Sequence, residues 1–310
     1  MSRLNHYAIS AILGSEIVGP VKVGHGQIAS VADAQQFFDR RTAQHAEGAA
    51  GTDQGFDADS LRAAFFAARE HFKDRFSTDR YVADPERNKM FLKKCRELGL
   101  RASDYVLNKR LFNARKNKLL PNLKSTRTQI PHEEFAFASE FAATELRYRE
   151  GASIDDIVCD PSLASRFDAI ARRIRPGFGS LEYRWAILSI RKAGRQHKLD
   201  PSFRMPRFTK GFRLTQDPIE RIPERSGIYL LYERSKLLYA RSARVLRHGV
   251  ELHRDAATVR AMAEKLWTPD PDDFVVDFAA IPPPMSVLDA IERKLVEERR
   301  PVFNIPRSAA

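Results

Sequence analysis

Four side chains in the last third of the chain have types and spacing suited to phosphodiester chemistry. Tyr229 and Tyr239 lie ten residues apart in two apolar, strand-like runs, and His253 follows fourteen residues later. Glu292 comes further on, in a segment with helical periodicity. Two tyrosines, a histidine and one carboxylate at these places could build a one-metal phosphodiesterase site.

Glu292 also stands out by its place on the helix that it occupies. At about 100° per residue, it falls inside an apolar arc, between Leu288 and Leu295. A carboxylate there is partly buried, which is costly unless it is paired or holds a cation. Two interpretations stay open at this point: a metal ligand, or a glutamate at the arc edge paired to an arginine.

Residues 226–304 resemble the GIY-YIG nuclease superfamily over about a quarter of the chain. The first motif is Gly227-Ile228-Tyr229, and the second, usually Tyr-Ile-Gly or Tyr-Val-Gly, is Tyr239-Ala240-Arg241. The remaining matches follow in the family's order and spacing: His253, Glu292, Pro301 and Asn304.

The resemblance implies a fold, a cofactor and roles for the four side chains. It implies a small three-stranded antiparallel sheet flanked by helices, with Mg²⁺ or Mn²⁺ held by Glu292 against the scissile phosphate. Tyr229 or Tyr239 would help to activate water, His253 would complete the catalytic set, and an arginine would brace the phosphate.

The sequence departs from the family pattern at two positions. Arg241 replaces the second-motif glycine, and Gly249 stands where the family has its arginine. Loss of a group that stabilises the transition-state charge commonly lowers the rate by ~10²–10³. One hypothesis is that Arg241, Arg244 or Arg247 reaches the phosphate instead.

The fold class predicted for the whole chain is α+β, with the helices mainly in the first two thirds. With 310 residues, two or three domains are expected. Residues 1–56 form a weakly structured segment, 57–200 a basic helical domain, 201–225 a basic and aromatic linker, and 226–310 the domain with the three-stranded sheet. Cys95 and Cys159 are expected to be buried, and no apolar run is long enough to span a membrane.

The charge of +12 indicates a polyanionic partner, most often nucleic acid. Two long basic runs, 105–132 and 169–198, contain almost no acids, and clustered cations release counterions from phosphates together. The residues expected to bind nucleic acid are Lys109, Arg110, Arg115, Lys116, Lys118, Arg172, Arg173, Arg191, Lys192, Arg207, Lys210, Arg241 and Arg244.

Two segments in this region suggest particular modes of binding. A glycine turn at Gly99 followed by a helix from Ser103 suggests a helix-turn-helix, in which Asn108, Lys109, Asn113 and Arg115 suit DNA contacts. Residues 203–213 interleave aromatic and basic side chains. That segment either stacks on unpaired bases or packs its phenylalanines between domains.

Three functions follow from these observations. The first is a cytoplasmic protein that binds double-stranded DNA through a degenerate nuclease fold, with weak or no cleavage. The second is an active Mg²⁺- or Mn²⁺-dependent endonuclease. The third is an adaptor whose basic charge serves an acidic protein partner.

Overall fold

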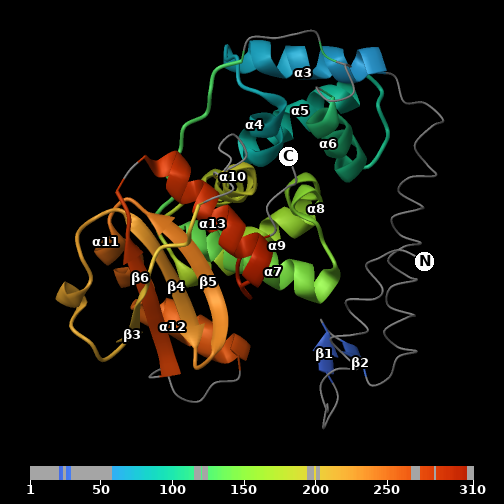
Figure 1. Cartoon of the computed structure of the whole chain (residues 1–310). Helices are drawn as coiled ribbons and strands as arrows, with labels where there is room; N and C mark the ends of the chain where they lie inside the picture. Colours follow the sequence, from blue (N-terminus) through green and yellow to red (C-terminus); the bar gives the residue numbers. More distant parts are fainter. Residues whose placement is uncertain are drawn as a thin grey trace.

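The structure is a computed structural model that describes most of the chain after residue 57. The described residues are 21–23, 26–28, 58–114, 120, 125–193, 199, 203–266, 273–282 and 284–305. Within residues 1–56, a short antiparallel hairpin joins β1 (Val21–Val23) to β2 (Gly26–Ile28). The later residues form a helical part and, after it, a part built on an antiparallel sheet (Figure 1).

The helical part confirms the predicted succession of helices. Ser103 begins its helix by accepting a hydrogen bond from the backbone of Val106, and Gly99 ends the preceding one at φ +79°. The helices are α3 (Ala58–Phe72), α4 (Thr78–Ala83), α5 (Pro85–Glu97), α6 (Asp104–Asn113), α7 (Ala136–Glu150), α8 (Ile154–Cys159), α9 (Pro161–Ile174) and α10 (Ser180–Lys192).

The sheet has four strands, so the prediction of three was wrong by one. The strands are β3 (Thr209–Arg213), β4 (Gly227–Glu233), β5 (Lys236–Ala243) and β6 (Phe274–Ala280), all paired antiparallel in the order β3-β6-β4-β5. The additional strand, β3, comes from the segment expected to be a linker. Its alternating pattern is hard to recognise because a bulge shifts its register between Thr209 and Phe212, and Gly211 has φ +81°.

Helices cover both faces of this sheet. Ile228 and Leu230 of β4 pack with α13 (Met285–Arg299). Tyr229 and Leu231 point to the other face, toward α11 (Leu246–Glu251), as the two-residue period of a strand requires. Helix α12 (Ala256–Leu266) follows α11, and the 3₁₀ turn Ile219–Arg221 precedes β4. Gly227 fits at the start of β4 because a Cβ there would lie 2.2 Å from the carbonyl oxygen of Ala279.

Helix α7 joins the helical part to the sheet. Phe137 packs edge-on against Tyr239, with ring centroids 5.0 Å apart, and Phe141 lies against Phe303 at 4.9 Å. The hydroxyl of Thr144 donates to the carbonyl of Phe303. The hydrophobic core therefore runs without a break from the helices into the sheet.

Residues 203–213 pack their aromatic side chains inward. Phe203 and Phe208 cover the apolar cluster between the sheet and α13, and Phe212 is 2% exposed. Phe203 and Phe208 thus pack within the sheet part, against β4, β5 and α13, rather than between domains. Cys95 and Cys159 are buried as expected, and no described helix has the length and apolar character needed to cross a membrane.

Candidate active site

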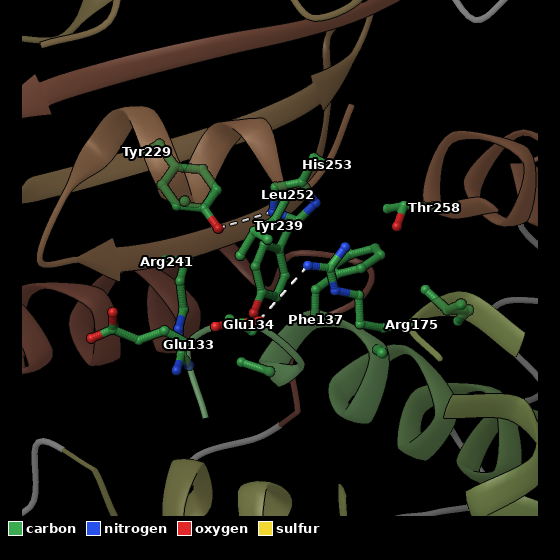
Figure 2. A pocket seen from close by; sticks show the side chains of 14 residues that line it. Glu133, Glu134, Phe137, Arg175, Tyr229, Tyr239, Arg241, Leu252, His253 and Thr258 are labelled. Atoms are coloured by element: carbon green, nitrogen blue, oxygen red, sulfur yellow. Dashed lines mark hydrogen bonds and ion pairs between the residues drawn. The ribbon is translucent and has the colours of Figure 1, made fainter. Parts of the chain in front are cut away.

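The structure brings three of the four predicted catalytic side chains, Tyr229, Tyr239 and His253, to one place (Figure 2). Tyr229 and Tyr239 project from the neighbouring strands β4 and β5, and His253 follows α11. The Tyr229 hydroxyl lies 2.9 Å from Nε2 of His253. The His253 ring also packs edge-on against Tyr239 and Phe137. Strand pairing and the short α11 thus create the constellation that the spacing predicts.

A carboxylate from the helical part completes this cluster. Glu140 of α7 is fully buried and accepts a 2.6 Å hydrogen bond from the Tyr239 hydroxyl. Its other oxygen accepts from the backbone of Ile305 at 3.1 Å and from Asn304 at 3.4 Å. Asn304 in turn pairs with both backbone groups of Ala240. The C-terminal segment, β5 and α7 are therefore tied together at one carboxylate.

Glu292 is buried as its place on the helix predicts, with 3% exposure. Its Oε2 accepts hydrogen bonds from the backbone N–H of Ser242 at 2.8 Å and from the Ser242 hydroxyl at 2.7 Å. The same hydroxyl also contacts Asp289. Oε1 of Glu292 faces the guanidinium of Arg241 at 3.4 Å. Both carboxylate oxygens are thus engaged by neighbouring groups of the protein.

Arg241 lies between the two buried carboxylates. Nη1 is 3.6 Å from Glu140 and 3.4 Å from Glu292, and the side chain is only 11% exposed. Burial by itself would lower the pKa of Arg241, but the charge of Glu292 and then the neighbouring Tyr239 and Glu140 hold that pKa above its ordinary value. The residue that departs from the family motif therefore supplies the positive charge in the cluster.

A divalent metal does not fit this arrangement. A metal ligand needs a free lone pair directed at an open position, whereas the Glu292 oxygens face Ser242 and Arg241. The guanidinium of Arg241 takes the position beside the carboxylate where a cation would bind. Among the residues that the structure describes, no group of three or more His, Cys, Asp or Glu side chains is placed to hold a metal ion.

The side chains of Tyr229, Tyr239 and His253 are neutral around pH 7. Burial raises the pKa of the hydroxyl groups of Tyr229 and Tyr239 above their ordinary value. Burial, with the nearby charge of Arg241, lowers the pKa of His253 to about 3. A neutral imidazole 2.9 Å from a neutral phenol forms a stable hydrogen bond. Neither tyrosine is available as a phenolate base to activate water.

A cavity of about 20 Å³ lies among Tyr229, His253, Gly249 and Thr258. This volume suits a single water molecule rather than a nucleotide. Nδ1 of His253 is buried and has no hydrogen-bond partner among the described residues. A water there would satisfy that nitrogen, since a buried polar atom without a partner is costly.

Gly249 leaves the space that the Tyr229 ring occupies. A Cβ at this position would lie 3.0 Å from Cε1 of Tyr229 and 3.0 Å from the Cβ of Ala243. The other two arginines considered as replacements for the missing one point elsewhere. Arg244 pairs with Glu133 at 3.0 Å, and Arg247 donates to the carbonyl of Ile222 at 3.0 Å and pairs with Glu224. Arg241 alone reaches Glu292.

The basic residues expected to bind nucleic acid fall into three groups. Several are paired within the protein: Lys109 with Asp156, Arg191 with Asp155, Lys192 with Asp79, Arg244 with Glu133, and Arg241 with Glu140 and Glu292. Arg172, Arg173, Arg207 and Lys210 are exposed, and Arg110 is half-buried. Arg115, Lys116 and Lys118 lie outside the described residues.

The suggested helix-turn-helix uses its polar face for packing. Asn108 of α6 is 1% exposed and donates to the carbonyl of Cys159 at 2.9 Å. It also exchanges hydrogen bonds with Asn88. Asn113 donates back to the carbonyl of Lys109 in the preceding turn. The amide of Asn108 is thereby directed into the protein, and that of Asn113 is engaged by its own helix.

Glu140 is the site residue that the sequence interpretation missed. The signal was available, because Glu140 lies three residues after Phe137 and four before Thr144, which places the three on one helix face. A carboxylate on that face needs a partner by the argument that singled out Glu292. Its partner, Tyr239, lies 99 residues away, which no local pattern reveals.

Comparisons of this chain with protein-family models, with curated proteins and with solved structures find no match.

Proposed function

We propose that this protein binds double-stranded DNA and cleaves it weakly or not at all, although residues 226–304 resemble the GIY-YIG nucleases. The observation that carries the proposal is the position of Arg241 between Glu140 and Glu292. The guanidinium takes the place of a metal cation beside the carboxylate. The residues at the catalytic positions then pack between the helical part and the sheet part.

The cover provided by α7 supports weak or absent cleavage. Tyr229, Tyr239, His253 and Glu292 are each no more than 3% exposed. A scissile phosphate must approach within hydrogen-bonding distance of the groups that stabilise its charge. Here Glu140 and Phe137 of α7 occupy that approach.

The charge of the chain supports the binding half of the proposal. The net charge is +12, and exposed cations remain after the internal ion pairs are taken into account. Each one placed on a phosphate releases counterions. A nucleic-acid partner also agrees with the expected cytoplasmic location.

The test combines a binding measurement with a cleavage assay on the full chain. Fluorescence anisotropy with a 20-bp duplex should show binding at about 50 mM salt that weakens steeply toward 200 mM. Supercoiled plasmid with Mg²⁺ or Mn²⁺ should remain uncut or be nicked only slowly. Cleavage that Glu292→Gln abolishes, with the variant still folded by circular dichroism, would establish the endonuclease instead. Absence of binding at 50 mM salt would leave the adaptor.

A further inference from the structure

An exposed basic strip lies at one edge of the sheet. It consists of Arg204, Arg207, Lys210 and Arg213, all exposed, on β3 and the residues just before it. No acidic residue occurs between 203 and 213. Strand β3 is the terminal strand in the sheet order, beyond β6 and away from α7 (Figure 1). The strip is therefore separate from the candidate active site.

A bulge accounts for the exposure of Lys210. In a regular strand Lys210 would share a face with Phe212, which is buried against the core. The register shift between Thr209 and Phe212 breaks that alternation, and Gly211 has φ +81°, a conformation that favours glycine. The N–H of Gly211 donates to Asp277 at 3.1 Å and holds the bulge in place.

Two acids beside the strip have other partners. Asp277 accepts the Gly211 N–H. Asp217 accepts the N–H of Arg213 at 2.8 Å and pairs with Arg221 at 3.0 Å, and the charge of Arg213 also acts on this carboxylate. All four strip residues are nevertheless exposed to solvent, where a polyanion can reach them.

The aromatic side chains of the segment decide which polyanion fits. Binding of unpaired bases needs exposed rings on which the bases stack. Phe203 and Phe208 pack on the cluster beneath α13, and Phe212 is 2% exposed. No ring of this segment is among its exposed residues, which are the four cations, Thr209 and Gly211. Exposed cations suit the phosphates of a duplex, which carry no sequence information.

We propose that the basic strip is the contact surface for the phosphate backbone of double-stranded DNA, bound without base recognition. This inference rests on the proposed DNA binding and names the surface that performs it. The bulge at Gly211 exposes Lys210, which joins Arg207 before it and Arg213 after it in the strip.

The test is a triple variant, Arg207→Gln/Lys210→Gln/Arg213→Gln, in the full chain. The matched control, Arg62→Gln/Lys89→Gln/Lys93→Gln, removes three exposed charges from α3 and α5, which lie at the other end of the molecule (Figure 1). Binding to a 20-bp duplex and to a 20-nucleotide oligo-dT strand is measured by anisotropy over a salt series. The strip variant should lose about tenfold or more in duplex affinity, and its slope of log K against log salt should fall by about 2.7, whereas the control stays near wild type.

The other outcomes separate the failure of this inference from that of the proposed function. Equal losses in both triple variants, or wild-type binding by the strip variant, overturn the strip while DNA binding stands. Tighter, strip-dependent binding of oligo-dT overturns the assignment to a duplex. If wild-type protein binds neither probe at about 50 mM salt, the proposed function fails, and the inference fails with it.

Discussion

Two largely buried arginines, one in each part of the molecule, show different uses of the same side chain. Arg184 of α10 makes a two-pronged pair with Asp168 of α9, at 3.0 and 2.5 Å. Arg241 of β5 instead faces two carboxylates, Glu140 and Glu292, at 3.6 and 3.4 Å. The two arginine side chains are buried to nearly the same extent, at 10% exposure for Arg184 and 11% for Arg241.

The difference lies in what else holds the carboxylates. Asp168 has Arg184 as its bidentate partner, the geometry in which guanidinium and carboxylate match best. Glu140 and Glu292 already accept shorter hydrogen bonds from Tyr239 and Ser242. Arg184 therefore forms a structural pair within the helical part. Arg241 acts as a charge placed between elements, in the position of a cation.

The largest effect should come from breaking the helical pair. Arg184→Met leaves the carboxylate of Asp168 buried without its partner, and we expect the free energy of unfolding to fall by about 3–5 kcal/mol. Urea denaturation measures this loss. The double variant Arg184→Met/Asp168→Leu should recover most of it, because no lone charge then remains buried. A near-neutral single variant would contradict the pairing.

Mild acid should weaken the C-terminal part before the helical part. The pKa of His253 is lowered to about 3 in the folded protein, from about 6.5 in the unfolded chain. The contribution of His253 to the free energy of unfolding is therefore complete above about pH 6.5 and is lost as the pH falls below it. We expect a loss of about 1.4 kcal/mol between pH 7.5 and 5.5, measured by urea denaturation. His253→Gln should lack this component of the pH dependence. An unchanged dependence in that variant would show that His253 titrates normally.

The helical part responds to acid in a lower range. Burial raises the pKa of Asp156, but hydrogen bonds from Ser153 and Tyr105 and the charge of Lys109 outweigh it and bring the pKa to about 2. The contribution of Asp156 to the free energy of unfolding is complete above its pKa in the unfolded chain, about 3.9, and is lost as the pH falls toward 2. Asp156 therefore adds nothing to the change between pH 7.5 and 5.5.

A smaller effect is expected at Gly249. Gly249→Ala gains helix propensity of about 1 kcal/mol, but its Cβ crowds Tyr229 and Ala243 at 3.0 Å, and such overpacking costs about 1–3 kcal/mol. The net loss should be about 1 kcal/mol in urea denaturation. Ala243→Gly combined with it should relieve part of the crowding. Clear stabilisation by Gly249→Ala would show that the Tyr229 ring moves aside freely.

The smallest measured change, a shift in melting temperature on adding a metal ion, tests the comparison of the two arginines most directly. Arg241→Met removes the cation between Glu140 and Glu292, so Mn²⁺ should raise the melting temperature of this variant by a few degrees through binding to the folded state. Wild type and Arg184→Met should not respond. A wild-type shift of equal size would mean that metal displaces the guanidinium, contrary to the proposed role of Arg241.

Local patterns were sufficient for most elements, whereas the convergence of the site residues was expected from the family resemblance. Helical periodicity and caps such as Ser103 placed the helices, and the alternating runs around Tyr229 and Tyr239 placed two strands. These features depend on neighbouring residues, so the sequence carries them openly. Strand β3 was missed because the Gly211 bulge interrupts the alternation on which such predictions depend.

Ion pairs between distant segments could not be read from the sequence. The basic runs contain almost no acids, yet Lys192 pairs with Asp79, 113 residues away, and Lys109 pairs with Asp156. Local charge runs do not show which cations are neutralised when the chain folds. The same limit hid Glu140, whose contacts with Tyr239 and Asn304 span 99 and 164 residues.

The tie between Glu140 and the C-terminal segment also bears on the order of folding during synthesis. Asn304 and Ile305 are made more than 160 residues after Glu140, which they contact. At about 5–20 residues per second, α7 leaves the ribosome on the order of ten seconds before those donors exist. During that interval the apolar face bearing Phe137 and Phe141 lacks its cover. The growing chain therefore exposes a hydrophobic surface of the kind that makes chaperones necessary.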